Sequence, residues 1–81
     1  AVAREMIFVK VQAEGPMRGE ILRTVEIFRC KVVDVSSNEM TIEATGNQDK
    51  LDAIINLLQR FGIKELARTG SVAIRRSKKT D

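Results

Sequence analysis

Few side chains in this 81-residue sequence could do chemistry. It contains no histidine, so the usual base of a nucleophile–base pair is missing. Asp49 and Asp52 are three residues apart and would share one face of a helix, as paired carboxylates for acid–base work require. Both also lie near the start of a predicted helix, where a carboxylate interacts favourably with the helix dipole. That structural role suffices for the pair, and we predict no catalytic residue.

The single cysteine, Cys30, supports neither a disulfide framework nor a metal site. A reactive thiol would need a depressed pKa, and the flanking Arg29 and Lys31 need not touch the sulfur. We interpret Cys30 as a structural residue, and we predict no metal and no cofactor. A lone cysteine is typical of a reducing compartment, so we expect the cytoplasm, or an organelle if the source is a eukaryote.

The net charge of +3 depends on the end of the chain. Residues 75–81 hold four of the fourteen basic side chains and one of the eleven acidic ones, so the rest of the chain is neutral. A basic tail could meet phosphate, but a solubilising terminus needs no partner. The best anion site elsewhere is Gly46-Asn47-Gln48, where a single glycine is a weak signal. No apolar run approaches the ~20 residues of a membrane span. We expect neither a nucleic-acid nor a membrane partner.

The hydrophobic period alternates between two and a helical value along the chain, which predicts the order strand, helix, strand, strand, helix, strand. This order is typical of a ferredoxin-like split βαβ sandwich (βαββαβ), an α+β fold with two helices on one face of an antiparallel sheet. We expect disordered or linker residues at 1–3, the domain at 4–76 with a strand extension at 72–74, and a basic tail at 77–81. The chain begins without methionine and reads as a piece of a longer protein. The expected strands cover residues 4–13, 31–36, 39–45 and 63–67, and the expected helices cover 17–29 and 47–61.

Side-chain alternation assigns most residues to a face. In the first strand, Ile7, Val9, Val11 and Ala13 should lie under the helices, while Met6, Phe8, Lys10 and Gln12 should face away. In the second strand, Val33 and Val35 should share one face, and Val32 and Asp34 the other. In the first helix, Ile21, Leu22, Val25 and Phe28 should form the buried stripe, with Arg18 and Glu20 among the outward residues.

The open face of this sheet could serve two purposes. The same topology binds RNA through aromatic side chains on its central strands, here positions Met6, Phe8, Thr41 and Glu43. Only one of them is aromatic, and Glu43 would repel phosphate. Met6 and Phe8 are therefore either scattered surface residues or half of a sheet-on-sheet interface. The small size of the domain favours the interface.

Five segments, taken together and in order, resemble the C-terminal domain of the small regulatory subunit of acetohydroxyacid synthase (acetolactate synthase). The resemblance covers about residues 4–76. The segments are Arg4-Glu5-Met6-Ile7-Phe8-Val9-Lys10-Val11, Ile27-Phe28-Arg29 leading into Val32-Val33-Asp34-Val35, Thr45-Gly46, Asp49-Lys50-Leu51-Asp52-Ala53, and Gly62-Ile63-Lys64-Glu65-Leu66-Ala67-Arg68-Thr69-Gly70.

The resemblance implies a non-catalytic domain that self-associates and that binds and activates the thiamine-diphosphate-dependent catalytic subunit in branched-chain amino acid biosynthesis. Valine feedback in this family implies that valine binds to an N-terminal ACT domain that is missing here. The candidate interface residues are Met6, Phe8, Lys10, Arg68 and Thr69. The alternative is a free-standing ACT-like module that binds an amino acid.

Overall fold

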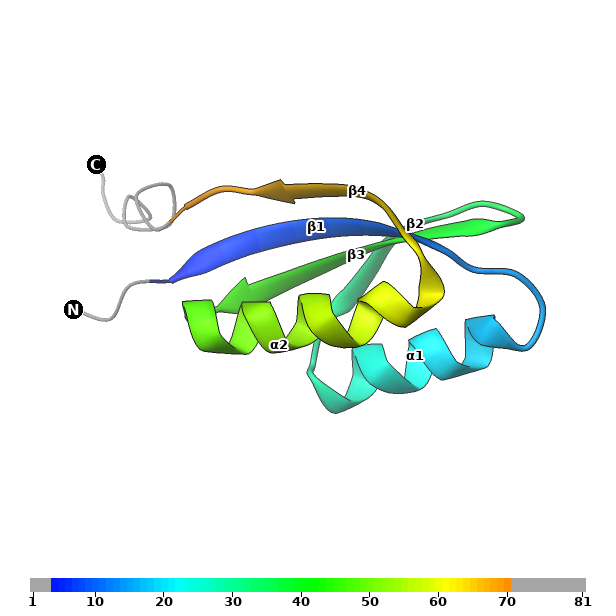
Figure 1. Cartoon of the computed structure of the whole chain (residues 1–81), viewed down its shortest axis with the longest axis horizontal. Coiled ribbons are helices and arrows are strands. Elements are labelled where there is room, and N and C mark those ends of the chain that lie inside the picture. The colour runs from blue at the N-terminus through cyan, green and yellow to red at the C-terminus, as the bar shows by residue number, and fades with distance from the viewer. Residues whose placement is uncertain (1–3, 71–81) are drawn as a thin grey trace.

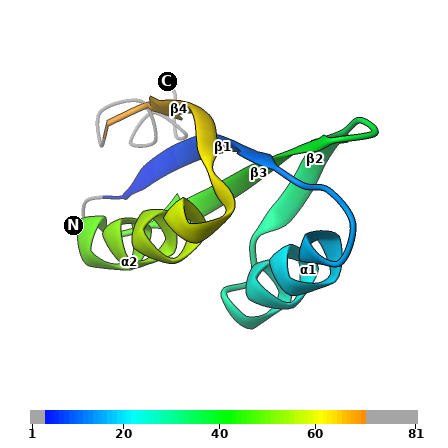
Figure 2. The same cartoon turned by 45° about the vertical axis from the view of Figure 1, so that its right-hand side comes forward.

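The computed structural model describes residues 4–70. Strands β1 (Glu5–Gln12), β2 (Lys31–Val35), β3 (Glu39–Gly46) and β4 (Ile63–Arg68) alternate with helices α1 (Met17–Ile27) and α2 (Gln48–Leu58), and a 3₁₀ turn η1 (Gln59–Phe61) follows α2. The sheet is antiparallel with the order β2-β3-β1-β4, and both helices cover one face (Figures 1 and 2). The predicted ferredoxin-like fold is confirmed. Residues 1–3, the expected strand extension at 72–74 and the basic tail lie outside the described residues. Within residues 4–70 no helix is long and apolar enough to cross a membrane.

The core lies between the sheet and the two helices. The alternation expected in the first strand is confirmed, since Ile7, Val9 and Val11 are fully buried on the helix side. Leu51, Ile54 and Leu58 of α2 pack in the same cluster, as do Ile21 and Val25 of α1. Each fully buried aliphatic side chain contributes roughly 1.5–3 kcal/mol, so this face of β1 makes a large contribution to the stability of the fold.

Helix α2 begins where the sequence predicts but ends at Leu58, and the 3₁₀ turn η1 continues the helical segment to the predicted end at Phe61. The Asn47 side chain accepts a hydrogen bond from the Lys50 amide at 2.8 Å, which satisfies one of the free donors of the first turn. Gly62 follows η1 with φ of 90°, a conformation that glycine adopts without a steric cost. This turn directs the chain into β4.

Two expectations for α1 are wrong. Leu22 is 47% exposed, because Ile21 and Val25 alone point straight at the sheet while Leu22 lies on the flank of the helix. Arg18 does not point outward. Its Nη1 donates to the carbonyl oxygens of Ala13, Ser36 and Ser37 at 2.7, 3.2 and 3.1 Å. One guanidinium group therefore joins the β1–α1 loop to the β2–β3 turn.

A bulge in β2 overturns the expected alternation of that strand. Val32 pairs with Ile42 and Asp34 pairs with Thr41, which leaves Val33 as an extra residue without a partner on β3. Because of this extra residue, Val32 and Val35 share the helix side, while Lys31 and Asp34 share the open face. A strict period of two cannot register an inserted residue, so the sequence pattern wrongly grouped Val32 with Asp34 instead of with Val35.

Candidate functional site

The open face of the sheet carries the predicted interface residues of β1. Met6, Phe8 and Lys10 lie on this face and are partly exposed, whereas their neighbours Ile7 and Val9 are fully buried on the other. Phe8 stands between Glu43 of β3 and Ala67 of β4, its cross-strand partners. The central strands are β1 and β3, as expected, so Phe8 lies near the middle of the sheet.

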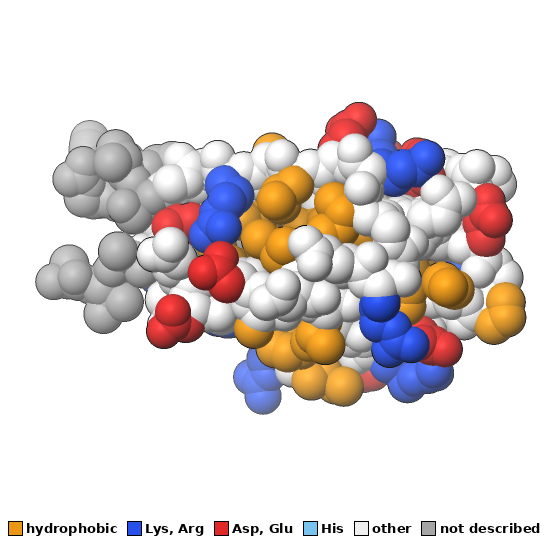
Figure 3. All heavy atoms as spheres, in the orientation of Figure 1, with side chains coloured by type: hydrophobic (Ala, Val, Ile, Leu, Met, Phe, Trp, Pro, Cys, Tyr) orange, Lys and Arg blue, Asp and Glu red, His pale blue; other side chains and the backbone are white. Residues whose placement is uncertain are grey.

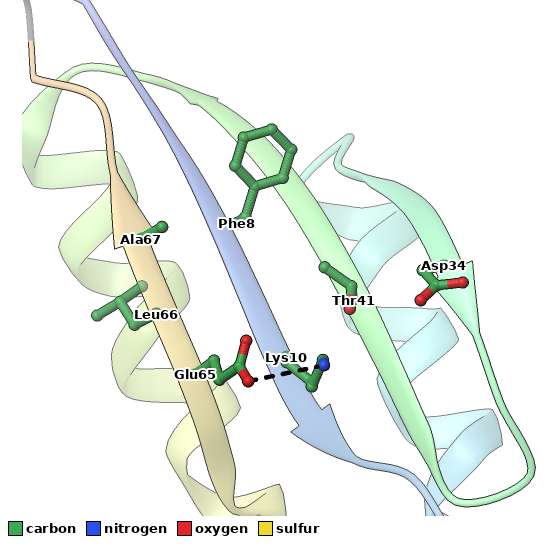
Figure 4. Close-up of a pocket in the computed structure, with 7 residues that line it drawn as sticks. All are labelled: Phe8, Lys10, Asp34, Thr41, Glu65, Leu66 and Ala67. Atoms are coloured by element: carbon green, nitrogen blue, oxygen red, sulfur yellow. Dashed lines mark ion pairs between the residues drawn. The ribbon is translucent and has the colours of Figure 1, made fainter.

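A shallow depression of about 620 Å³ lies on this face, and all four strands contribute to it (Figure 4). The apolar part consists of Phe8 together with Ala67 and Leu66, and a Lys10–Glu65 ion pair of 3.8 Å bounds it. The complete lining is Phe8, Lys10, Asp34, Thr41, Glu65, Leu66 and Ala67. An apolar centre with charged groups around it matches the general anatomy of a protein–protein interface.

Arg68 does not join this group. It pairs with Ile7 across β1 and therefore lies on the helix side of the sheet. Its guanidinium group donates to Glu5 at 2.9 and 3.2 Å and to Asp52 of α2 at 3.1 Å. The hydrogen bonds that Arg68 donates, first to Asp52 and then to Glu5, raise the pKa of Arg68 further above its ordinary value. Arg68 ties the end of the edge strand β4 to both β1 and α2.

Thr69 closes the same end of the sheet. Its backbone amide donates to the Met6 carbonyl at 2.9 Å, and its hydroxyl oxygen accepts from the Met6 amide at 3.1 Å. Arg68 and Thr69 thus hold β4 against β1. The five candidate residues therefore divide into three on the open face and two that hold the end of β4.

The remaining chemical candidates have structural surroundings. Asp52 is engaged by Arg68, and Asp49 lies exposed in the first turn of α2. Burial raises the pKa of the partly buried Cys30 thiol, an effect larger than the opposing influence of the Lys50 charge. A raised pKa disfavours the nucleophilic thiolate. In the part of the chain from 4 to 70, no cluster of three or more His, Cys, Asp or Glu residues could hold a metal.

The helix side of the molecule also exposes apolar atoms. Figure 3 shows apolar side chains between β4 and α2 with charged groups beside them. Leu66 of β4 is 44% exposed because β4 is an edge strand. Leu66 lies on the helix side, opposite Val9, yet also lines the depression. The β4 and β2 contributors to the depression could not be recognised from the sequence alone. Once the strand order is known, the pairing of Ala67 with Phe8 identifies the first of them.

A family model described as the small subunit of acetolactate synthase matches residues 4–77. The chain belongs to this family. The acetolactate synthase small subunit of Aquifex aeolicus is 57% identical over 76 residues, which cover 93% of this chain and 40% of the relative. The one from Mycolicibacterium smegmatis is 46% identical over 76 residues, which cover 94% of this chain and 45% of the relative.

The crystal structure of the acetolactate synthase small subunit from Thermotoga maritima has the same fold. It superimposes with a TM-score of 0.78 at 46% identity, over 85% of this chain and 42% of that one. The resemblance found in the sequence is therefore confirmed, both for the family and for the ferredoxin-like fold. The chain spans less than half the length of these relatives.

Proposed function

We propose that this chain is a non-catalytic regulatory domain of acetolactate synthase that self-associates and that binds and activates the thiamine-diphosphate-dependent catalytic subunit. We further propose that the open sheet face, centred on Phe8, is the surface that meets the catalytic subunit. The single observation that carries the second proposal is the apolar depression on that face. Membership of the small-subunit family supports the first.

The open face differs from an ordinary solvated sheet face. A one-sided antiparallel sheet normally alternates apolar residues toward the core and polar residues toward water. Here Phe8 and Ala67 interrupt the polar side at its centre and Met6 extends the apolar group toward the start of β1, while Lys10 and Glu65 stand at its edge. Covering this centre would bury apolar surface and leave the ion pair at the rim, where water still reaches it.

The size of the domain supports docking as well. A chain of this length buries only roughly 60% of the surface of its unfolded state, so its stability on its own is small. A contact with a larger subunit stabilises the folded state by mass action. We place the protein in a reducing compartment, in keeping with the free, partly buried Cys30.

A reconstitution assay tests the proposal. Purified acetolactate synthase catalytic subunit is titrated with the 81-residue chain, with and without valine, while acetolactate formation is followed. We expect saturable activation that valine leaves unchanged, since valine binding is proposed for a domain outside this chain. Neither activation nor co-migration with the catalytic subunit would refute the proposed function. Inhibition by valine, or a valine-dependent rise in the melting temperature of the chain alone, would instead support the amino-acid-binding alternative.

The variant Phe8→Asp tests the surface. We expect it to weaken binding to the catalytic subunit, because the carboxylate would have to be desolvated at the centre of the contact. Full activation by a folded Phe8→Asp chain would exclude the open face as the docking surface. Weakened self-association of the same variant would assign this face to a second copy of the chain.

A further inference from the structure

The two edges of the sheet differ in their side chains. β4 carries Lys64, Glu65 and Arg68, three charged residues of the kind that protect an edge from pairing. β2 consists of Lys31-Val32-Val33-Asp34-Val35, so three of its five residues are valine. Val33 and Val35 are 46% and 53% exposed. Among the described strands β2 pairs only with β3 and forms the second edge of the sheet (Figure 2).

A further exposed apolar residue lies next to β2 in the sequence. Ile27, the last residue of α1, is 75% exposed and precedes β2 by only a short turn. Helix α1 packs against β2 at the same side of the molecule (Figure 2). An exposed valine-rich edge with an apolar residue nearby is a surface on which another strand can pair.

The charges of β2 are self-complementary. The bulge at Val33 places Lys31 and Asp34 on the same face of the sheet, at the two ends of the bulged segment. Both side chains are exposed, and neither forms an ion pair with another residue of the 4–70 range. A twofold axis through the bulge would bring Lys31 of each copy opposite Asp34 of the other. Cross-strand pairs of opposite charge stabilise a sheet, and like charges destabilise it.

We propose that β2 pairs antiparallel with β2 of a second copy of this chain about a twofold axis at the Val32–Val33 bulge. The pairing joins the two sheets into one and places Val32 and Val33 of both copies around the axis. It leaves both open faces free and on the same side of the joined sheet, so that both can meet catalytic subunits. This inference depends on the proposed function only for self-association, to which it assigns a surface.

The partner is a second copy because the pattern is self-complementary. An isologous contact requires one patch to fit itself, and Lys31 with Asp34 satisfies that requirement about a single axis. A five-residue edge together with Ile27 is a small contact by the standard of stable interfaces, which bury roughly 1,200–2,000 Å². We therefore expect a weak dimer that forms at high concentration of the chain.

Sedimentation equilibrium of a charge-swap series tests the pairing. The series contains the 81-residue chain, Lys31→Asp, Asp34→Lys and the double variant with both substitutions. Each single variant replaces two attractive pairs with two repulsive ones, so we expect the dimer dissociation constant to rise at least tenfold. The double variant restores opposite charges across the axis, and we expect it to recover to within about threefold of the original chain, since each exposed pair is worth under ~1 kcal/mol.

Matched controls separate association from folding. Lys31 lies opposite Glu43 of β3, so Lys31→Asp also adds a repulsion within the chain. Asp34 lies opposite Thr41, so Asp34→Lys adds no such repulsion. Thermal unfolding of each variant identifies any loss of fold. Lys64→Asp makes the same change on the other edge, and we expect its association to stay within about twofold of the original.

Three results would overturn the pairing: unchanged association of Asp34→Lys, no recovery in the folded double variant, or equal weakening by Lys64→Asp. A chain that stays monomeric up to about 1 mM would also refute it. Activation of the catalytic subunit by such a monomer would leave the activating part of the proposed function intact. Loss of activation in a chain that still dimerises through β2 would refute the activating part of the proposed function and leave the β2 pairing intact.

Discussion

Replacing Arg18 with methionine should destabilise the domain more than any other exposed-charge substitution on α1. Methionine keeps the unbranched stem and a high helix propensity, so the change removes the guanidinium group and little else. Three carbonyl oxygens lose a donor, those of Ala13, Ser36 and Ser37. The consequence is a loosened junction between the β1–α1 loop and the β2–β3 turn.

The magnitude follows from the surroundings of the three acceptors. A hydrogen bond to a charged group contributes about 1.5–3 kcal/mol. The bond to Ala13 is 2.7 Å long and partly buried, so it should account for most of the effect. The bonds to Ser36 and Ser37 are longer and exposed, and water can replace the donor there. We expect a loss of about 2 kcal/mol in the free energy of unfolding, which for a domain of this size lowers the melting temperature by roughly 8–16 °C.

Urea denaturation of Arg18→Met against Arg23→Met measures this difference. Arg23 lies exposed on the same helix, and none of the hydrogen bonds or ion pairs within residues 4–70 involves it. Its replacement should change stability by less than about 0.5 kcal/mol. Equal effects of the two substitutions would refute the role assigned to Arg18, since a simple loss of surface charge would then explain both.

Three further outcomes are expected. Ala67→Lys places a charge in the depression without removing a buried contact, and we expect it to weaken activation of the catalytic subunit at least tenfold. Ala53→Lys, on the exposed side of α2, should leave activation unchanged. Equal effects of the two substitutions would argue against the open face as the docking surface. Arg68→Met removes the ion pairs to Glu5 and Asp52 and should lower the free energy of unfolding by about 1 kcal/mol at low salt, and by less in 1 M salt, where charges are screened. A loss that does not depend on salt would point to packing instead of these ion pairs. Because burial raises the pKa of Cys30, the unfolded chain releases its thiol proton first as pH rises, so the free energy of unfolding should decline above pH ~8.5. Between pH 7 and pH 10 the urea midpoint should fall less in Cys30→Ala than in the original chain. An identical fall in both would contradict the raised pKa.

The sequence predicted the elements of this domain because local periodicity and local turn chemistry carry most of that information. Asn47 and Gly62 act through their own backbone and near neighbours, so cap and terminator could be recognised without knowing the fold. The buried face of β1 follows from strict alternation along eight residues. The position of Phe8 on the open face follows from the same rule.

Errors occurred where one element depends on another. The bulge at Val33 is a relation between β2 and β3, and nothing in the Lys31–Val35 segment alone distinguishes an inserted residue from a regular one. Arg18 reads as an ordinary outward charge until carbonyl groups of the β1–α1 loop and of the more distant β2–β3 turn converge on it. Arg68 reads as a candidate interface residue until β4 pairs with β1 and turns its guanidinium group toward α2.

By itself the sequence determined the order of strands and helices, most of the core residues and the absence of histidine-based chemistry, because each of these depends on residue type and short spacing. The tertiary structure decided which side chains share a surface. Only the strand order places Ala67 beside Phe8 and leaves β2 at an edge, and only the bulge puts Lys31 and Asp34 on one face. Pairing between distant segments sets these neighbours, and a local period cannot contain that information.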